Sequence, residues 1–182
     1  MTPRSPLVLS ADDLPLAELL AARLDGEVFG IGSGFASVAE LEQPQHRAAS
    51  LGAANSRLIA EQRTAAWIWG ALTRAPERHE FCSTLTERVA HQSSRFITVR
   101  EVVLDPDDLI TLAGRQVTTP LRTCLDLARF SAEFGRPERA IVRDLMSLAG
   151  VGMLDFTRHL NRRRNLPHKT VALARLTECV AD

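Results

Sequence analysis

Asp107 and Asp108 are two adjacent carboxylates that could bind the metal ion of a nuclease. Many metal-dependent nucleases bind their metal through paired carboxylates that are followed by a lysine on a strand. The only lysine in the sequence, Lys169, comes 61 residues after Asp108, in a segment that predicts a helix. The sequence therefore lacks the acid-x-Lys arrangement, and we interpret both aspartates as turn residues.

A second set of chemically capable residues is His79, Cys82 and His91, which have the spacing H-x2-C-x8-H. A zinc site requires ligands that converge on one point. The segment 79–85 predicts a strand, and alternation along a strand would send His79 and Cys82 to opposite faces. The spacing therefore favours two ordinary histidines and a core cysteine over a metal site.

Two other patterns resemble catalytic or cofactor motifs without completing them. The segment GIGSG at 30–34 has no following Gly-Lys-Ser/Thr, and Ala36 and Ser37 break the dinucleotide-binding spacing, so a hairpin turn is favoured. No GxSxG motif occurs, and Cys124 falls on the apolar face of a predicted helix, where core packing explains it. We therefore expect no catalytic residues, no metal and no cofactor.

A basic stretch, RHLNRRRNLPHK at 158–169, carries five positive charges and no acidic residue. Such a patch can contact nucleic-acid phosphates or an acidic partner protein. The alternative is an ordinary solvated face between two packed helices, since no aromatic side chains interleave as in a single-strand platform. The candidate binding residues are Arg158, Arg162, Arg163, Arg164 and Lys169.

The bulk composition is that of an ordinary globular protein. The 182 residues are 45% hydrophobic and 24% charged, and the formal net charge is zero, which argues against polyanion binding by bulk charge. Three cysteines form no CxxC motif, and their odd number argues against a disulfide framework. The excess of arginine over the single lysine and the absence of tyrosine are typical of a GC-rich bacterial genome. We see neither an apolar run of about 20 residues nor a signal peptide, so we expect a cytoplasmic protein with no membrane association.

The hydrophobic pattern predicts an α+β fold in which strands and helices occupy separate runs of the chain. Four strands at 79–85, 95–103, 108–112 and 115–118, most of them joined by short connections, predict a small antiparallel meander. Helices are expected at 14–24, 45–54, 64–72, 119–130, 136–149, 153–164 and 168–180, a hairpin at 27–38 and a short strand at 57–60. The expected division is a disordered tail at 1–13, a helix–hairpin arm at 14–44 and a body at 45–182.

The helix expected after residue 119 has clear local signals. Thr119 is a suitable N-cap and Pro120 a suitable first helical residue. Arg122 and Asp126 stand at i and i+4, which predicts a local ion pair worth a few tenths of a kcal/mol. Trp67, in an earlier helix, lies off the main apolar stripe, and we favour a second packing face over an exposed anchor for a partner.

Two segments together resemble a known family. RLIAEQRTAAWIWGAL at 57–72 is similar to a strand followed by a Ser/Thr-Ala-Ala-Trp helix that ends in glycine, and GRQVTTPLRTCLDLAR at 114–129 is similar to a G-x-x-VTTP-x-RT-x-x-DLA signature. In this order they resemble the AbiEi family, the antitoxins of type IV toxin–antitoxin abortive-infection systems. The signature positions are Thr118, Thr119, Pro120, Arg122, Thr123, Asp126 and Leu127. The resemblance implies that they define the fold through a helix cap, a first turn, an ion pair and core packing.

The resemblance also implies a function. In that family an N-terminal winged helix commonly binds the promoter, and a C-terminal domain neutralises a nucleotidyltransferase-like toxin. Here only one helix and one hairpin, at 14–38, precede the shared body. This helix and hairpin are similar to the last part of a winged helix, so we expect a degenerate form of that module. Residues 1–45 hold seven acidic and two basic side chains, which oppose DNA phosphates.

The leading expectation is therefore a non-enzymatic antitoxin or regulator that acts by binding a cognate toxin protein. The alternative is a transcriptional regulator that binds promoter DNA through the N-terminal hairpin or the basic C-terminal helices.

Overall fold

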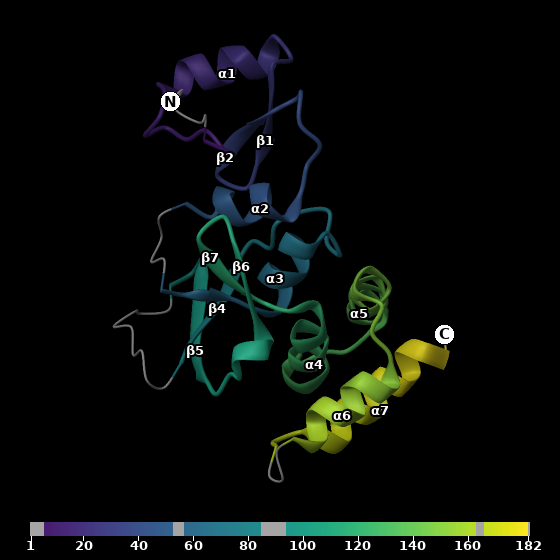
Figure 1. Cartoon of the computed structure of the whole chain (residues 1–182). Coiled ribbons are helices and arrows are strands. Elements are labelled where there is room, and N and C mark those ends of the chain that lie inside the picture. Colours follow the sequence, from purple (N-terminus) through teal and green to yellow (C-terminus); the bar gives the residue numbers. More distant parts are fainter. Residues whose placement is uncertain (1–5, 53–56, 85–93, 163–165, 182) are drawn as a thin grey trace. The chain divides into compact units, whose positions relative to one another are not determined.

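A computed structural model describes residues 6–52, 57–84, 94–162 and 166–181 (Figure 1). The chain divides into two compact units. Unit 1 comprises Met1–Ser56 and Thr111–Arg115, and unit 2 comprises Arg57–Ile110 and Gln116–Asp182. Within the described ranges, no helix combines the length and apolar character needed to cross a bilayer.

Unit 1 contains the expected helix and hairpin. Helix α1 (Leu16–Leu24) is followed by the antiparallel strands β1 (Val28–Ile31) and β2 (Gly34–Ser37) and by helix α2 (Pro44–Ser50). A small core forms from Leu19, Val28 and Phe35. The backbone of Leu9 pairs with that of Phe35, and a Cβ at Gly34 would lie 2.7 Å from the Leu9 carbonyl oxygen. Glycine at this position therefore allows the N-terminal segment to approach the hairpin.

The described residues form one five-stranded sheet, in the order β5-β4-β3-β7-β6. Its strands are β3 (Ile59–Ala60), β4 (His79–Thr84), β5 (Ile97–Val102), β6 (Leu109–Leu112) and β7 (Arg115–Thr118). Strand β3 runs antiparallel to β4 and parallel to β7, and β4 runs parallel to β5. The sheet is therefore mixed, with its shortest strand at the centre.

The α+β class is confirmed, but the antiparallel meander is wrong. Parallel neighbours need a crossover of about a dozen residues, and residues 85–96 between β4 and β5 provide that length. Parallel pairing of Ala60 with Val117 then makes β7 a neighbour of β3 and not of β5. The strands lie close to where the hydrophobic pattern predicts them, but strands that are consecutive in the sequence are not always neighbours in the sheet.

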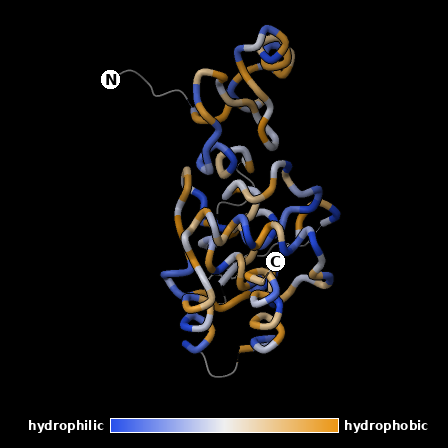
Figure 2. The backbone as a smooth tube through the Cα atoms, turned by 90° about the vertical axis from the view of Figure 1, so that its right-hand side faces the viewer, coloured by the Kyte–Doolittle hydropathy of each residue, from blue (hydrophilic) through white to orange (hydrophobic). Residues whose placement is uncertain are grey.

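The helices of unit 2 pack around α4 (Pro120–Phe130), which contacts α3 (Gln62–Trp69), α5 (Arg136–Ala149), α6 (Met153–Asn161) and α7 (Lys169–Ala181). Hydrophobic and hydrophilic residues follow one another at short intervals along the chain (Figure 2), and each of α4, α5 and α6 buries some of its residues. The expected capping of α4 is confirmed, because Thr119 Oγ1 accepts a hydrogen bond from the Arg122 backbone N–H at 3.2 Å. Helix α3 ends earlier than expected, since Gly70 adopts a left-handed conformation with φ of 96°.

One hydrophobic core fills the space between these helices. Its buried side chains include Cys124 from α4, Leu145 from α5, Phe156 from α6 and Leu176 from α7. The core role of Cys124 and the packing role of Trp67 are both confirmed, since each is buried. The neighbouring Trp69 donates its indole N–H to the Thr118 carbonyl at 2.8 Å, which links α3 to the end of β7.

Replacing Phe156 by alanine should destabilise the protein severely. The side chain is 0% exposed in the core, and its loss leaves a cavity that typically costs about 3–5 kcal/mol. Urea unfolding measures the change in the free energy of unfolding. Leu154 on the same helix is 80% exposed, so Leu154→Ala is the matched control and should change it by less than about 0.5 kcal/mol. Similar losses for both variants would contradict the packing of α6.

Candidate functional site

The start of α4 is built by threonines that bond to one another and to the backbone. Thr118 Oγ1 lies 2.8 Å from Thr123 Oγ1, and the Thr123 hydroxyl also lies 2.8 Å from the Thr119 carbonyl oxygen that accepts from it. Thr118 and Thr123 are fully buried. Together with Pro120 in the first turn, these bonds fix the direction in which α4 leaves β7, and so they fix the position of Arg122.

Asp126, on α4, is the centre of a buried ionic network. Its carboxylate oxygens lie 2.9 Å from Arg122 Nε, 3.2 Å from Arg100 Nη2 and 3.4 Å from Arg129 Nη1. The side chain of Asp126 is 0% exposed and that of Arg122 is 6% exposed. The expected Arg122–Asp126 pair is therefore present, but its interpretation as a weak local pair is wrong, because it lies in a desolvated interior.

Two further buried carboxylates complete the network. Glu61 accepts two hydrogen bonds from Arg100, at 2.6 Å from Nε and 2.7 Å from Nη2. Asp108 ends the short 3-10 helix η1 (Pro106–Asp108), and it accepts from Arg122 Nη1 and, at 2.9 Å, from the backbone N–H of Asp105, the N-cap of η1. Asp108 thus occupies a turn, as expected, and is in addition buried. Three carboxylates meet three guanidinium groups, so the network is formally neutral.

Burial and pairing act in opposite directions on these groups. Burial raises the pKa of Glu61, and the hydrogen bond and charge of Arg100 oppose that rise. Burial tends to lower the pKa of Arg122, but Asp126 and Asp108 reverse the effect, so the net pKa is raised. The guanidinium groups therefore stay charged at any physiological pH.

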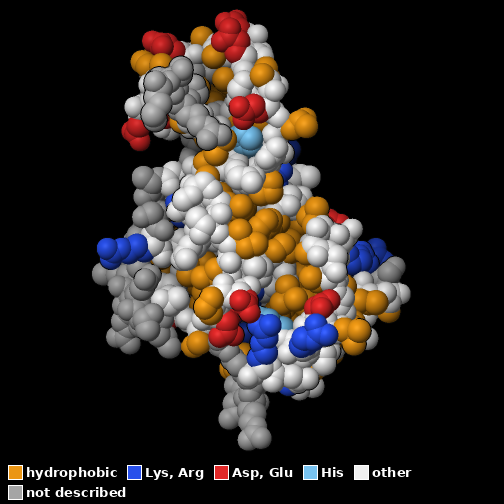
Figure 3. All heavy atoms as spheres, in the orientation of Figure 1, with side chains coloured by type: hydrophobic (Ala, Val, Ile, Leu, Met, Phe, Trp, Pro, Cys, Tyr) orange, Lys and Arg blue, Asp and Glu red, His pale blue; other side chains and the backbone are white. Residues whose placement is uncertain are grey.

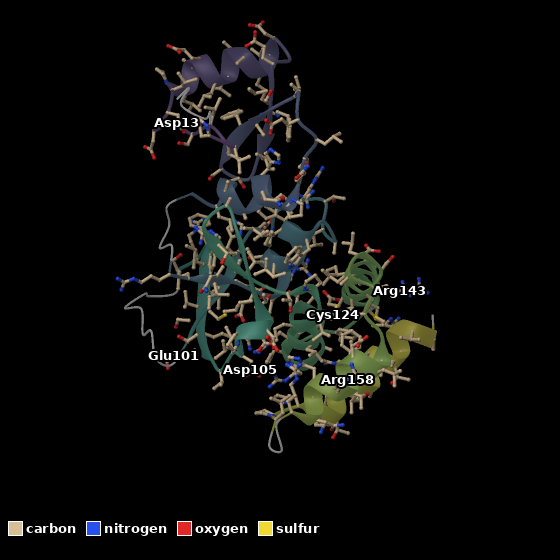
Figure 4. The ribbon with its side chains drawn as sticks, viewed as in Figure 1. Asp13, Glu101, Asp105, Cys124, Arg143 and Arg158 are labelled. Carbon is tan, nitrogen blue, oxygen red and sulfur yellow. The ribbon has the colours of Figure 1, made fainter. Side chains whose placement is uncertain are left out.

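A pocket of about 360 Å³ lies beside the network within unit 2. Acidic, basic and histidine side chains gather in the lower half of the face that Figure 3 shows, and Figure 4 labels Asp105, which lines the pocket. The lining residues are Arg100, Glu101, Val102, Val103, Asp105, Arg122, Leu125, Arg129, Phe130, His159, Leu160, Leu166 and Pro167. The pocket thus combines basic groups from three elements with an apolar wall.

His159, from α6, lines this pocket above Asp108. Its Nε2 lies 3.3 Å from Asp108 Oδ1, an oxygen with no hydrogen-bond partner among the described residues. Burial lowers the pKa of His159, Asp108 opposes the shift, and Arg122 and Arg162 add to it. The imidazole is therefore neutral at pH 7 and gains its proton only under more acidic conditions.

A family model of the AbiEi antitoxin C-terminal domain matches residues 58–155, which is more than half of the chain. The chain belongs to this family. The family resemblance noted in the sequence is thus confirmed, and the match includes Glu61, Arg100, Arg122 and Asp126 of the ionic network.

One solved structure supports the fold of the AbiEi protein. The crystal structure of the RV2827C protein from Mycobacterium tuberculosis is similar to it, with a TM-score of 0.51 and 18% sequence identity. The similarity covers 97% of this chain and 72% of that one. At this level of identity the similarity concerns the fold alone. No curated protein matches the sequence.

The residues predicted to bind a partner lie on and after α6 of the AbiEi protein. Arg158 is 3.7 Å from Asp155, Arg162 is 3.6 Å from Asp107, and Lys169 donates to Asn161 Oδ1 at 2.7 Å. Arg163 and Arg164 lie outside the described residues, as does His91 of the H-x2-C-x8-H spacing. In the described ranges no group of three or more His, Cys, Asp or Glu residues is arranged to hold a metal ion.

Sequence reasoning missed Glu61, Arg100 and His159, which belong to the AbiEi network or its pocket. Their partners are 26 or more residues away, so no local spacing connects them. A signal was present for Glu61, a carboxylate that directly follows the apolar run LIA. A charge at such a position is either exposed or paired, and here it is paired.

Replacing Asp126 by asparagine should destabilise the AbiEi protein. Three guanidinium groups lose their shared counter-charge, and breaking a buried pair typically costs about 3–5 kcal/mol. The measurement is the free energy of unfolding in urea. Glu178→Gln removes an exposed carboxylate 3.5 Å from Arg139 and should cost less than about 1 kcal/mol. Equal effects would show that burial of the network contributes nothing.

Acidification should destabilise the protein partly through His159. Its folded-state pKa lies below the ordinary histidine value of about 6.5, so the unfolded chain binds the proton more readily. The free energy of unfolding therefore falls as pH drops through about 6.5 toward the folded pKa. His159→Gln should reduce this fall when wild type and variant are compared by urea unfolding at several pH values. Parallel curves for the two proteins would refute the assignment.

Proposed function

We propose that this chain is a non-enzymatic antitoxin or regulator that acts through protein binding. The match of the AbiEi family to residues 58–155 carries the proposal. The charged side chains inside that segment support it, because Glu61, Arg100 and Asp126 are paired with one another. Groups whose charges are already matched stabilise a scaffold more readily than they activate a substrate.

We further propose that the partner is a nucleotidyltransferase-type toxin encountered in the bacterial cytoplasm. This proposal adds to the family assignment the toxin-neutralising role that the family resemblance implies. An antitoxin of this kind needs an exposed surface that the scaffold holds in place, and α6 offers one: Phe156 and Leu160 are buried in the core, whereas Arg158 is exposed.

The proposed contact surface consists of the basic residues on and after α6, namely Arg158, Arg162, Arg163, Arg164 and Lys169. The side chain of Arg158 is 75% exposed, and its distance to Asp155 is long for a charge-assisted hydrogen bond. Arg162 pairs with Asp107, which is itself exposed. Such surface pairs are worth little, so acidic groups on a partner can replace the intramolecular ones at small cost.

Co-expression with a nucleotidyltransferase-type toxin from the same genome tests the proposal. We expect the chain to restore growth that the toxin alone arrests. The double variant Arg158→Glu/Arg162→Glu should weaken toxin binding about tenfold or more, because charges that attracted the partner now repel it. Calorimetry with the purified proteins measures the binding, and the free energy of unfolding should change by less than about 0.5 kcal/mol.

A matched control is Arg136→Glu/Arg143→Glu, which reverses two exposed charges on α5 and should leave binding unchanged. Absence of rescue would contradict the antitoxin role. Rescue that survives the α6 reversal would leave the role standing and dismiss the surface.

DNA binding through the hairpin of unit 1 or through the same basic residues is the second candidate function, and it predicts a different response. Affinity for upstream promoter DNA would fall steeply with salt, by about 0.9 logarithmic units per phosphate contact for each tenfold rise in salt. Fluorescence anisotropy against the upstream duplex and a scrambled duplex distinguishes the two functions. Preference for the upstream duplex would assign the chain to promoter regulation.

A further inference from the structure

The pocket beside the ionic network contains guanidinium N–H donors that protein groups use weakly or not at all. Arg100 donates through Nε and Nη2 to Glu61, and its Nη1 has no hydrogen-bond partner among the described residues. Arg122 Nη2 donates to the Val103 carbonyl oxygen at 3.5 Å, the limit of a hydrogen bond. Both guanidinium groups line the pocket.

These donors are held rigidly in place. Arg100 donates two short hydrogen bonds to Glu61, and its guanidinium carbon lies 4.3 Å from the centroid of the Phe130 ring. Asp108 and Asp126 hold Arg122. A ligand that binds to such pre-positioned groups does not have to order them first, so it loses less conformational entropy.

The rest of the pocket indicates the kind of ligand. Val102, Phe130 and Leu166 contribute an apolar wall, and the volume of about 360 Å³ is at the lower end of the range for small-molecule sites. Glu101 and Asp105 also line it. Their negative charges repel a ligand with several negative charges, such as a polyphosphate. The best match is therefore a ligand with one negative charge and an apolar body.

We propose that this pocket binds a small organic carboxylate, whose oxygens accept hydrogen bonds from Arg100 and Arg122 while its apolar body lies against Val102, Phe130 and Leu166. A planar carboxylate suits two guanidinium groups that present N–H donors in fixed directions. The proposal is independent of the toxin-binding role, which concerns the outer face of α6.

His159 makes the binding depend on pH. The groups that face it are Asp108 and Asp105, which favour its proton, and Arg122 and Arg162, which oppose it. An added carboxylate supplies a further negative charge and raises the pKa of the imidazole. Binding therefore takes up a proton, and the affinity rises as the pH falls.

The experiment is a calorimetric titration of the whole chain with benzoate, phenyl phosphate and benzyl alcohol at about pH 7.5 and about pH 5.5. We expect benzoate to bind with a dissociation constant on the order of 1 mM or lower. Phenyl phosphate, largely a dianion at the higher pH, should bind more weakly there, and neutral benzyl alcohol at least about tenfold more weakly. Benzoate affinity should rise about threefold to tenfold at the lower pH.

Two variants test the location. Arg100→Met removes the free donor but leaves Glu61 buried without its partner, so circular dichroism must first confirm its fold. Val103→Trp leaves the ionic side chains in place and fills the pocket, since Val103 is exposed and lines it. Either folded variant should weaken benzoate binding about tenfold or more. Arg143→Gln, on the exposed face of α5 (Figure 4), should bind as the wild type does.

His159→Gln should bind benzoate with the same affinity at both pH values. The proposal is overturned if benzoate shows no saturable binding up to about 20 mM. It is also overturned if benzyl alcohol binds as well as benzoate, or if Val103→Trp binds as the wild type does.

Discussion

The rest of unit 2 depends on the sharing of Asp126 among three arginines. Arg100 comes from β5, Arg122 and Arg129 come from α4, and Asp126 lies between them with no exposure to solvent. A carboxylate in such a place is costly unless every oxygen is engaged. The ionic network therefore holds three pairs of elements together. Asp126 and Arg100 connect α4 to β5 at the sheet edge, and Arg122 and Asp108 connect α4 to η1. Glu61 and Arg100 connect the junction between β3 and α3 to β5.

This constraint separates what local pattern can predict from what it cannot. The caps, bounds and apolar faces of α4 and α5 follow from Thr119, Pro120 and Gly150, because each acts within one turn of its own backbone. The sheet order does not follow from local pattern, because the pairing of Ala60 with Val117 depends on how strands that are far apart in the sequence pack in the folded chain. The Arg122–Asp126 spacing indicated an ion pair. Its burial could not be predicted, because β5 and η1 cover the pair and the spacing of residues within those two elements does not indicate this contact.

The same division applies to the candidate sites. The basic residues after Leu160 were visible in the sequence because charge runs are local. The pocket was not, because Arg100, Phe130 and His159 come from separate elements and converge only in the folded chain. A search for chemistry that relies on spacing therefore finds surfaces more readily than cavities.

The central strand β3 has a consequence for how the chain is made. Its two neighbours are β4, which follows within about 20 residues, and β7, whose Val117 comes 57 residues after Ala60. During synthesis β3 can pair on one side early, but its other edge stays open until the ribosome has released the segment that precedes α4. Because α4 carries Asp126, the ionic network and the second edge of β3 are completed together, only after α4 has been made.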